Sequence, residues 1–162
     1  MKRRLRKIRS KYLKKSCVSF FFTNPVSIRW LTGFSGSYSS LLVSQSDVYF
    51  FTDFRYIERA RSEVKDARIR MVENGFFDEL NNLPRAALGK IMAFESDHLT
   101  FEQYQKLSKT IPDVKLEGIS EATSFFSRIK DTAEIKKIEK AVELADNVLS
   151  TIIPLIRPGI RE

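Results

Sequence analysis

The segment YSSLLVSQSDVYFFT, residues 38–52, decides the fold class of this chain. Residues 38–44 and 47–52 are mostly apolar and aromatic, which is typical of strands that pack on a core. Only Gln45 and Ser46 separate them, and a connection this short predicts a β-hairpin. Strands joined in this way run antiparallel, so the sheet that contains them is not purely parallel.

Strands and helices alternate along the rest of the chain. Apolar or alternating segments predict four more strands, at residues 17–22, 67–72, 90–94 and 114–117. Periodic apolar positions and capping residues predict helices at residues 54–64, 76–83, 101–109 and 121–127. This order predicts an α/β domain with a mixed β-sheet of about six strands flanked by helices.

Residues 24–40 interrupt the alternation. They contain Pro25, Gly33 and Gly36 among serines and threonines, which are residue types that favour turns. Asn24 precedes a proline, and a residue in that position avoids the α region. We therefore expect a loop in this segment.

The clearest helical pattern lies near the end of the chain. Asp131 followed by Glu134 is close to a capping box. Apolar residues then recur at alternating spacings of three and four, at Ile135, Ile138, Val142, Ala145, Leu149, Ile152 and Ile156. This seam predicts a long helix that ends or kinks near Pro154. We expect one α/β domain at residues 1–130 and a linker helix within residues 131–162.

Composition narrows the class of protein. The chain has 162 residues, of which 43% are hydrophobic and 30% charged, so a disordered protein is excluded. The sequence contains no run of about 18 apolar residues, so it predicts no membrane span. The single cysteine, Cys17, excludes an internal disulfide and a cysteine-based zinc site, and we expect it in the core. These features favour a reducing, cytoplasmic location.

The net charge of +8 is concentrated in the first 15 residues. They hold nine of the 28 basic residues and no acid, which leaves 19 basic and 20 acidic residues in the other 147. Apolar residues at Leu5, Ile8, Tyr12 and Leu13 predict a first helix that packs on the core, with its basic residues in water. Binding of nucleic acid or an anionic membrane, and a targeting peptide, stay open as alternatives.

The residues alone predict no complete active site. Acidic residues are scattered, so no set of ligands for two metal ions is visible. The segment Gly33–Gly36 lacks the ending of a phosphate-binding loop. The serines nearby have no base beside them, and His98 next to Asp97 is typical of a surface pair.

One polar and aromatic cluster, Asp53-Phe54-Arg55-Tyr56, follows a predicted strand and opens a predicted helix. Asp53 is placed to cap that helix, and Arg55 is a planar donor suited to a carboxylate. Two interpretations stay open. The cluster is either a helix cap with an internal ion pair, or a contact to a ligand or another subunit.

Four segments resemble the Xaa-Pro aminopeptidase, prolidase and creatinase family. Asn24–Ser37 (NPVSIRWLTGFSGS) resembles the family's NPxNIxYLTGFSGS, and Thr52–Tyr56 resembles its TDxRY. Arg128–Ile138 is similar to the start of its interdomain helix, and Ile153–Gly159 to the stretch that leads into its catalytic domain. The segments keep the family's order and spacing, and the similarity covers nearly the whole chain.

The resemblance implies a creatinase/prolidase-type N-terminal α/β domain without catalytic or metal-binding residues. In the family's peptidases a second domain binds two divalent metals, usually manganese or cobalt, and cleaves the peptide bond before proline. None of the acids here match those metal-ligand motifs. A similar domain also occurs without catalysis in the large histone-chaperone subunit of the FACT complex, so a protein- or histone-binding module is the alternative.

The resemblance also implies where this domain acts. It is expected to shape substrate access and subunit contacts, with its own catalytic domain, a second copy of the chain and proline-containing peptides as partners. Neither nucleic acid nor membrane is expected as a partner. The candidates for substrate-proximal or subunit contacts are Trp30, Asp53, Arg55 and Tyr56.

Overall fold

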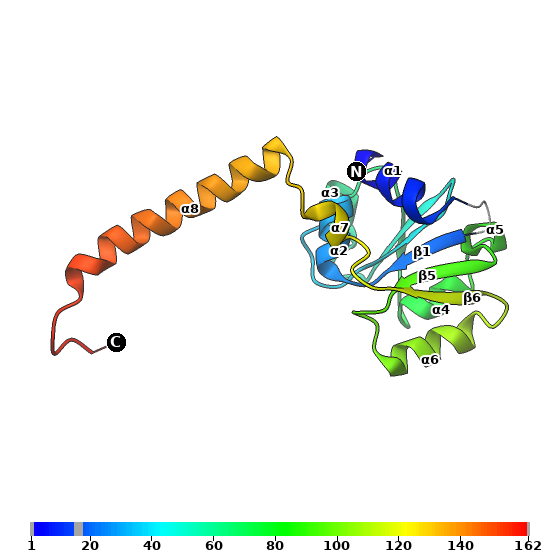
Figure 1. Ribbon diagram of the computed structural model, residues 1–162. Coiled ribbons are helices and arrows are strands. Elements are labelled where there is room, and N and C mark those ends of the chain that lie inside the picture. Colours follow the sequence, from blue (N-terminus) through cyan, green and yellow to red (C-terminus); the bar gives the residue numbers. More distant parts are fainter. Residues whose placement is uncertain (1, 15–17, 162) are drawn as a thin grey trace. The chain divides into compact units, whose positions relative to one another are not determined.

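The computed structural model describes residues 2–14 and 18–161 (Figure 1). The chain divides into two units, Met1–Phe126 and Ser127–Glu162. The first unit contains the whole sheet, and the second contains one long helix. Cys17, which was expected in the core, lies outside the described residues.

The sheet is mixed and has six strands in the order β4-β3-β2-β1-β5-β6. They are β1 (Val18–Phe22), β2 (Ser40–Val43), β3 (Val48–Thr52), β4 (Arg68–Met71), β5 (Ile91–Glu95) and β6 (Lys115–Ile119). β2 is antiparallel to β1 and β3, and every other neighbouring pair is parallel. The predicted fold class and hairpin are both confirmed.

Helices cover both faces of the sheet (Figure 1). One layer contains α1 (Lys2–Tyr12), α2 (Pro25–Thr32) and α3 (Ile57–Glu63), and the other contains α4 (Phe76–Leu80), α5 (Arg85–Leu88) and α6 (Phe101–Thr110). Side chains alternate between the faces of a strand, so Phe20 and Phe22 join the first core cluster while Phe21 joins the second. A short helix, α7 (Ser124–Ser127), follows β6.

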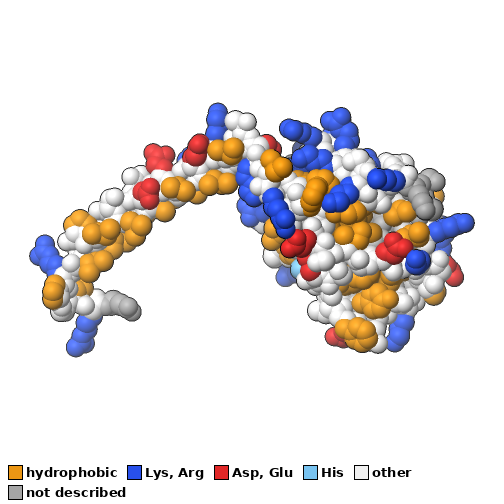
Figure 2. All heavy atoms as spheres, viewed as in Figure 1, with side chains coloured by type: hydrophobic (Ala, Val, Ile, Leu, Met, Phe, Trp, Pro, Cys, Tyr) orange, Lys and Arg blue, Asp and Glu red, His pale blue; other side chains and the backbone are white. Residues whose placement is uncertain are grey.

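The basic first segment forms α1, and its apolar residues are buried as expected. Leu5, Ile8 and Leu13 are all in the first core cluster. Arg9 Nε donates to Ser44 O at 2.8 Å, so one of the basic residues is also fixed to the domain. Most of the others are exposed, and Figure 2 shows Lys and Arg side chains gathered over α1. α1 is therefore a structural helix with a cationic outer side.

The expected loop at residues 24–40 is wrong in part, because α2 occupies Pro25–Thr32. Asn24 is its N-cap, with Oδ1 accepting from Val26 N at 2.9 Å, and Pro25 takes the first helical position. Gly33, at a φ of 86°, is the C-cap. Proline, glycine and asparagine here mark the two ends of a helix, which is the other arrangement that these residues favour. The short helix α5 was not predicted either.

The second unit contains α8 (Thr132–Ile152), followed by the 3-10 turn η1 (Ile153–Leu155). The predicted capping box is confirmed: Glu134 N donates to Asp131 Oδ1 at 3.0 Å, and Asp131 N donates to Glu134 Oε2 at 2.8 Å. Figure 2 shows the hydrophobic side chains of α8 along one side of the helix. The division into a domain at 1–130 and a linker at 131–162 stays a prediction.

No helix within residues 2–14 and 18–161 is both long enough and apolar enough to cross a membrane.

Candidate functional site

Two polar clusters lie at one edge of the sheet, where the five parallel strands end. The strand register places Thr52 beside Met71 and Glu95 beside Ile119, and β2 begins at this edge because it runs in the opposite direction. In open α/β sheets, ligands bind at the carboxyl ends of the strands. The Asp53 cluster is defined as Ser37, Tyr38, Asp53, Arg55 and Tyr56. The Glu95 cluster is defined as Thr23, Asn24, Ser27, Glu95 and Thr123.

Asp53 and Arg55 form an ion pair within one turn of chain. Arg55 Nε and Nη2 donate to Asp53 Oδ2 at 2.8 and 2.6 Å, and Arg55 N donates to Asp53 Oδ1 at 3.0 Å. The carboxylate raises the pKa of the guanidinium. The Asp53 side chain is 13% exposed and that of Arg55 is 58% exposed. The Asp53 carboxylate therefore fixes the direction of the Arg55 guanidinium, which is exposed to solvent.

The predicted helix cap at Asp53 is wrong, because α3 begins at Ile57 and its N-cap position is Tyr56. Asp53 instead closes the turn that precedes the helix, with Tyr56 N donating to Asp53 O at 3.2 Å. An Asp side chain that accepts from the amide two residues later stabilises a turn as readily as a helix end. The internal ion pair of the same interpretation is confirmed.

Tyr56 connects this cluster to the glycine-rich loop. Its hydroxyl lies 2.8 Å from Ser37 Oγ, and this hydrogen bond lowers the pKa of Tyr56. Its ring packs edge-on against Phe34 at 6.1 Å. Arg55 lies over the rings of both Tyr38 and Tyr56, with centroid distances of 5.7 and 5.6 Å. Arg55 thus makes cation–π contacts with both tyrosine rings of the cluster.

Gly36 shows why the loop needs a glycine at this position. A Cβ added there would lie 2.7 Å from Phe34 Cε1 and 2.8 Å from Tyr56 Cδ1, which is too close for real atoms. The loop is also attached to α3, because Ser35 N and Oγ both donate to the Glu63 carboxylate at 2.8 Å. These bonds lower the pKa of Glu63. The loop therefore packs closely against the ring of Tyr56 and is anchored to α3.

A hollow of about 470 Å³ adjoins the ion pair. Its lining residues are Tyr38, Asp53, Phe54, Arg55, Met71, Val72 and Glu73. Phe54 is 75% exposed and Met71 is also exposed, so two large apolar side chains border a cation held in place. Such a surface suits an apolar or aromatic partner residue next to an acceptor of hydrogen bonds.

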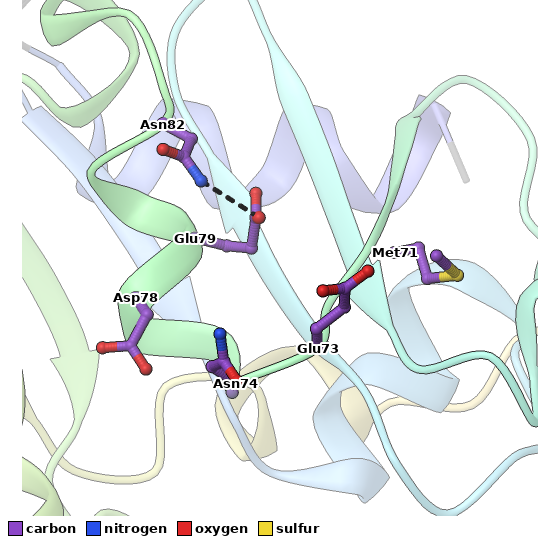
Figure 3. Close-up of a pocket in the computed structure, with 7 residues that line it drawn as sticks. Met71, Glu73, Asn74, Asp78, Glu79 and Asn82 are labelled. Atoms are coloured by element: carbon purple, nitrogen blue, oxygen red, sulfur yellow. Dashed lines mark hydrogen bonds between the residues drawn. The ribbon is translucent and has the colours of Figure 1, made fainter.

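A second hollow, of about 310 Å³, shares Met71 and Glu73 with the first (Figure 3). Three of its polar residues already have partners. Asn82 Nδ2 donates to Glu79 Oε1 at 3.1 Å, and Asp78 pairs with Lys106 at 3.3 Å. Figure 3 shows the Asp78 carboxylate pointing away from Glu79. The acidic residues therefore do not converge on one point.

Trp30, the remaining candidate, is half-buried against the core. Its ring is stacked on Phe126 at 6.3 Å with an angle of 8° between the planes, and Arg4 lies over it at 5.1 Å. Arg4 also donates to Trp30 O. The structure brings Asp53, Arg55 and Tyr56 together, whereas Trp30 belongs to a different set of contacts, between α1, α2 and α7.

Sequence reasoning missed the Glu95 cluster. Glu95 is only 2% exposed, and its Oε2 accepts from Thr23 N and Asn24 N at 3.1 and 3.0 Å. Ser27 Oγ donates to its Oε1 and lies 2.6 Å from Thr123 Oγ1. Burial raises the pKa of Glu95, and the hydrogen bonds offset part of that rise. The available signal was a carboxylate that ends the buried strand KIMAFE, residues 90–95.

Within residues 2–14 and 18–161, no three His, Cys, Asp or Glu side chains lie close enough together to hold a metal ion.

Comparison with known families gives a match to the Creatinase/Prolidase N-terminal domain over residues 4–125. Among curated relatives, the uncharacterized peptidase YqhT of Bacillus subtilis is 29% identical over 159 residues. That alignment covers 98% of this chain and 45% of the relative.

Solved structures show the same fold. The Xaa-Pro dipeptidase of Bacillus anthracis is 27% identical with a TM-score of 0.91, over 99% of this chain and 45% of that one. The X-Pro aminopeptidase of Thermotoga maritima is 28% identical with a TM-score of 0.81, over 90% of this chain and 43% of that one. The chain spans less than half the length of each of these relatives.

Proposed function

Because the chain belongs to the Creatinase/Prolidase N-terminal domain family, we propose that it is the non-catalytic N-terminal domain of a Xaa-Pro peptidase. In this proposal a second domain holds two divalent metals, manganese or cobalt, and hydrolyses peptide bonds that precede proline. The present domain shapes substrate access to that site and supplies subunit contacts in a homodimer. Its partners are its own catalytic domain, a second copy and proline-containing peptides.

The observation that carries the proposal is the extent of the match. The family match spans residues 4–125, and the similar dipeptidase and aminopeptidase are more than twice as long as this chain. The metal-binding donors that are not assembled in the described residues would then belong to the rest of such a protein. We also propose that residues 131–162 lead toward that catalytic domain and that the protein is cytoplasmic.

The Asp53 cluster supports the part of the proposal that concerns access. Asp53 holds Arg55 in place beside a hollow bordered by the exposed Phe54. A cation whose direction is fixed before binding loses little conformational entropy when a peptide or a second subunit docks. We propose that Asp53, Arg55 and Tyr56 form this contact, and that Trp30 serves mainly to pack α2 against Phe126.

The first test uses the chain alone. We expect the 162-residue chain to show no cleavage of proline-containing peptides when manganese is added, because its described residues hold no assembled set of metal donors. Proline-specific turnover that disappears on substitution of Asp53 or Arg55 in this chain would overturn the proposal.

The second test reads the gene beyond codon 162 and uses its full product. We expect about 200 further codons that encode metal-ligating Asp, Asp, His, Glu and Glu in that order, the set that the family resemblance implies for a site with two metals. An unrelated sequence or a stop codon would favour the protein- or histone-binding alternative.

In that full product, Arg55→Ala should raise the KM for a proline peptide about five- to tenfold with little change in kcat, because it removes binding rather than chemistry. The matched control is Arg61→Ala, which removes an exposed arginine that pairs with Glu58 in α3. Equal effects of the two substitutions would argue against a contact at the Asp53 cluster.

A further inference from the structure

The Glu95 cluster joins three segments that are far apart in the sequence. Glu95 ends β5, Ser27 lies in the first turn of α2, and Thr123 immediately precedes α7. Both carboxylate oxygens of Glu95 accept hydrogen bonds, Oε2 from the backbone at the start of α2 and Oε1 from Ser27. A buried carboxylate is costly unless such donors surround it, so its position is closely specified.

The direction of the hydrogen bonds follows from the chemistry of the groups. An ionised carboxylate only accepts, so Ser27 uses its single hydroxyl hydrogen on Glu95. Ser27 Oγ lies 2.6 Å from Thr123 Oγ1, and it can then only accept from Thr123. Protonated Glu95 would donate to Ser27 and reverse both bonds. The charge of Glu95 therefore sets the orientation of both hydroxyl groups.

A second contact between the same two segments lies next to this hydroxyl pair. Trp30 is three residues after Ser27 in α2, and Phe126 is three residues after Thr123. Their rings are stacked at 6.3 Å, and Phe126 N donates to Thr123 O at 3.0 Å. Residues three apart in α2 lie on one side of the helix, and the bond from Phe126 N to Thr123 O closes the turn that holds these two residues together. The hydroxyl pair and the ring stack are therefore neighbouring contacts.

We propose that Glu95 is a positioning residue, whose carboxylate orders the hydroxyl groups of Ser27 and Thr123 and so holds the segment Thr123–Phe126 against α2. Phe126 is the last residue of the first unit, so Glu95 fixes the segment from which the chain leaves that unit. The inference rests on contacts within this chain and does not depend on the proposed peptidase function.

Two other titratable side chains face the cluster. Asp97 adds to the rise in the pKa of Glu95, and its Oδ2 accepts from Glu121 N at 3.1 Å. His98 Nδ1 lies 3.2 Å from Thr23 Oγ1. Both are exposed, whereas Glu95 is buried. Because three titratable groups lie close together, substitution is needed to show which of them causes a response to pH.

Trp30 is the single tryptophan of the chain, so all tryptophan fluorescence comes from the ring that takes part in this contact. We expect Glu95→Ala to shift the Trp30 emission to longer wavelength while the far-UV circular dichroism stays that of the folded chain. Cleavage by trypsin after Arg128 or Lys130, measured by mass spectrometry, should become about tenfold faster, because the preceding segment opens more often. Glu95→Gln is uncharged but can still accept from the Thr23 and Asn24 amides through its one oxygen, so it should recover only part of both properties.

The matched control is Ser19→Ala. Ser19 is buried in β1 and its Oγ donates to Leu88 O at 2.6 Å, so the substitution removes a buried hydrogen bond away from the cluster. It should leave the Trp30 emission and the tryptic cleavage unchanged. Thr123→Val removes the hydroxyl link while Glu95 is kept, and should reproduce the emission shift. This variant carries the test if Glu95→Ala does not fold.

A pH titration separates positioning from a general loss of stability. In the native chain the Trp30 emission should change with a midpoint above 4.5, the ordinary value of a glutamate pKa. Glu95→Gln should abolish this change, and His98→Asn should leave it in place. The proposal is overturned if folded Glu95→Ala and Thr123→Val keep the native emission, if Ser19→Ala has equal effects, or if His98→Asn alone removes the titration.

Discussion

The Asp53 cluster and the Glu95 cluster lie at the same edge of one sheet, but they differ in exposure and in what their carboxylates contact. Asp53 pairs with the exposed Arg55, two residues away in the sequence. Glu95 is buried and contacts Thr23, Asn24 and Ser27, about 70 residues earlier. The first carboxylate shapes a surface, and the second connects segments of the fold.

The comparison teaches that a carboxylate at the ligand-binding edge of an α/β sheet is not by itself a functional group. Position at the edge is common to both clusters, whereas solvent exposure separates them. Loss of an exposed ion pair costs little because water solvates both charges. Loss of a buried acceptor leaves its donors without water or partner. Substitutions at Glu95, Gly36, Asp53 and Glu63 test this distinction.

The largest effect is expected for Glu95→Ala. It leaves the amides of Thr23 and Asn24 and the hydroxyl of Ser27 without their acceptor in a buried site, and we expect the free energy of unfolding to fall by about 3 kcal/mol. Urea denaturation of the 162-residue chain measures it. A loss below about 1 kcal/mol, the range of surface pairs, would remove the distinction between the clusters.

Gly36→Ala should follow, because the new Cβ collides with the rings of Phe34 and Tyr56. We expect a loss of about 2 kcal/mol, as for other overpacked sites, measured by the same denaturation. Gly33→Ala is the control, since a Cβ there meets nothing within 4 Å and the cost comes only from the φ of 86°, about 1 kcal/mol. A neutral Gly36→Ala would mean that the loop does not hold Tyr56 as tightly as described.

Substitution of Asp53 should have a smaller effect on stability. The ion pair with Arg55 is largely exposed on the arginine side, so we expect Asp53→Ala to lower the free energy of unfolding by about 1 kcal/mol. Denaturation at low and high salt should show a smaller loss at high salt, because ions screen the pair. A loss equal to that of Glu95→Ala would show that Asp53 too is a structural residue.

The smallest effects are those of pH, and the two glutamates with shifted pKa values should act in opposite directions. Burial raises the pKa of Glu95 above 4.5, so just above pH 4.5 the folded chain keeps a proton that the unfolded chain has lost. This contribution to stability is present below pH 4.5 and is lost as the pH rises through the folded pKa. Glu95→Gln should flatten that decline.

Hydrogen bonds from Ser35 lower the pKa of Glu63, so its contribution is present above pH 4.5 and is lost as the pH falls through the folded pKa. Glu63→Gln should therefore weaken the loss of stability in acid. Unfolding measured from about pH 3 to about pH 7 gives both slopes. If both substitutions changed the slope of stability against pH in the same direction, the assignment would be contradicted.

The amphipathic helices show how far a pattern can be taken. Leu5 and Ile8 in α1 and Ile138 and Val142 in α8 all follow helical spacing, and both helices were predicted. In α1 these residues are buried, whereas in α8 they are about half exposed. The spacing determines which side of a helix is apolar, but only the surrounding chain determines whether that side is covered.

Elements whose signals are local could be predicted from the amino-acid sequence. The hairpin at residues 38–52, the capping boxes of α6 and α8 and the pairing of Asp53 with Arg55 all involve residues close in the chain, so short-range chemistry specifies them. The family resemblance rested on such local segments as well.

Features that depend on distant segments could not be predicted, because folding brings their partners together. Whether Asn24, Pro25 and Gly33 formed a loop or bounded a helix depended on packing of Ile28 and Leu31 against the sheet. Glu95 found its donors in α2 and beside α7, and nothing in the neighbouring sequence indicates them. A buried polar group is defined by the partners that folding brings to it, and these are set by strand order rather than by sequence distance.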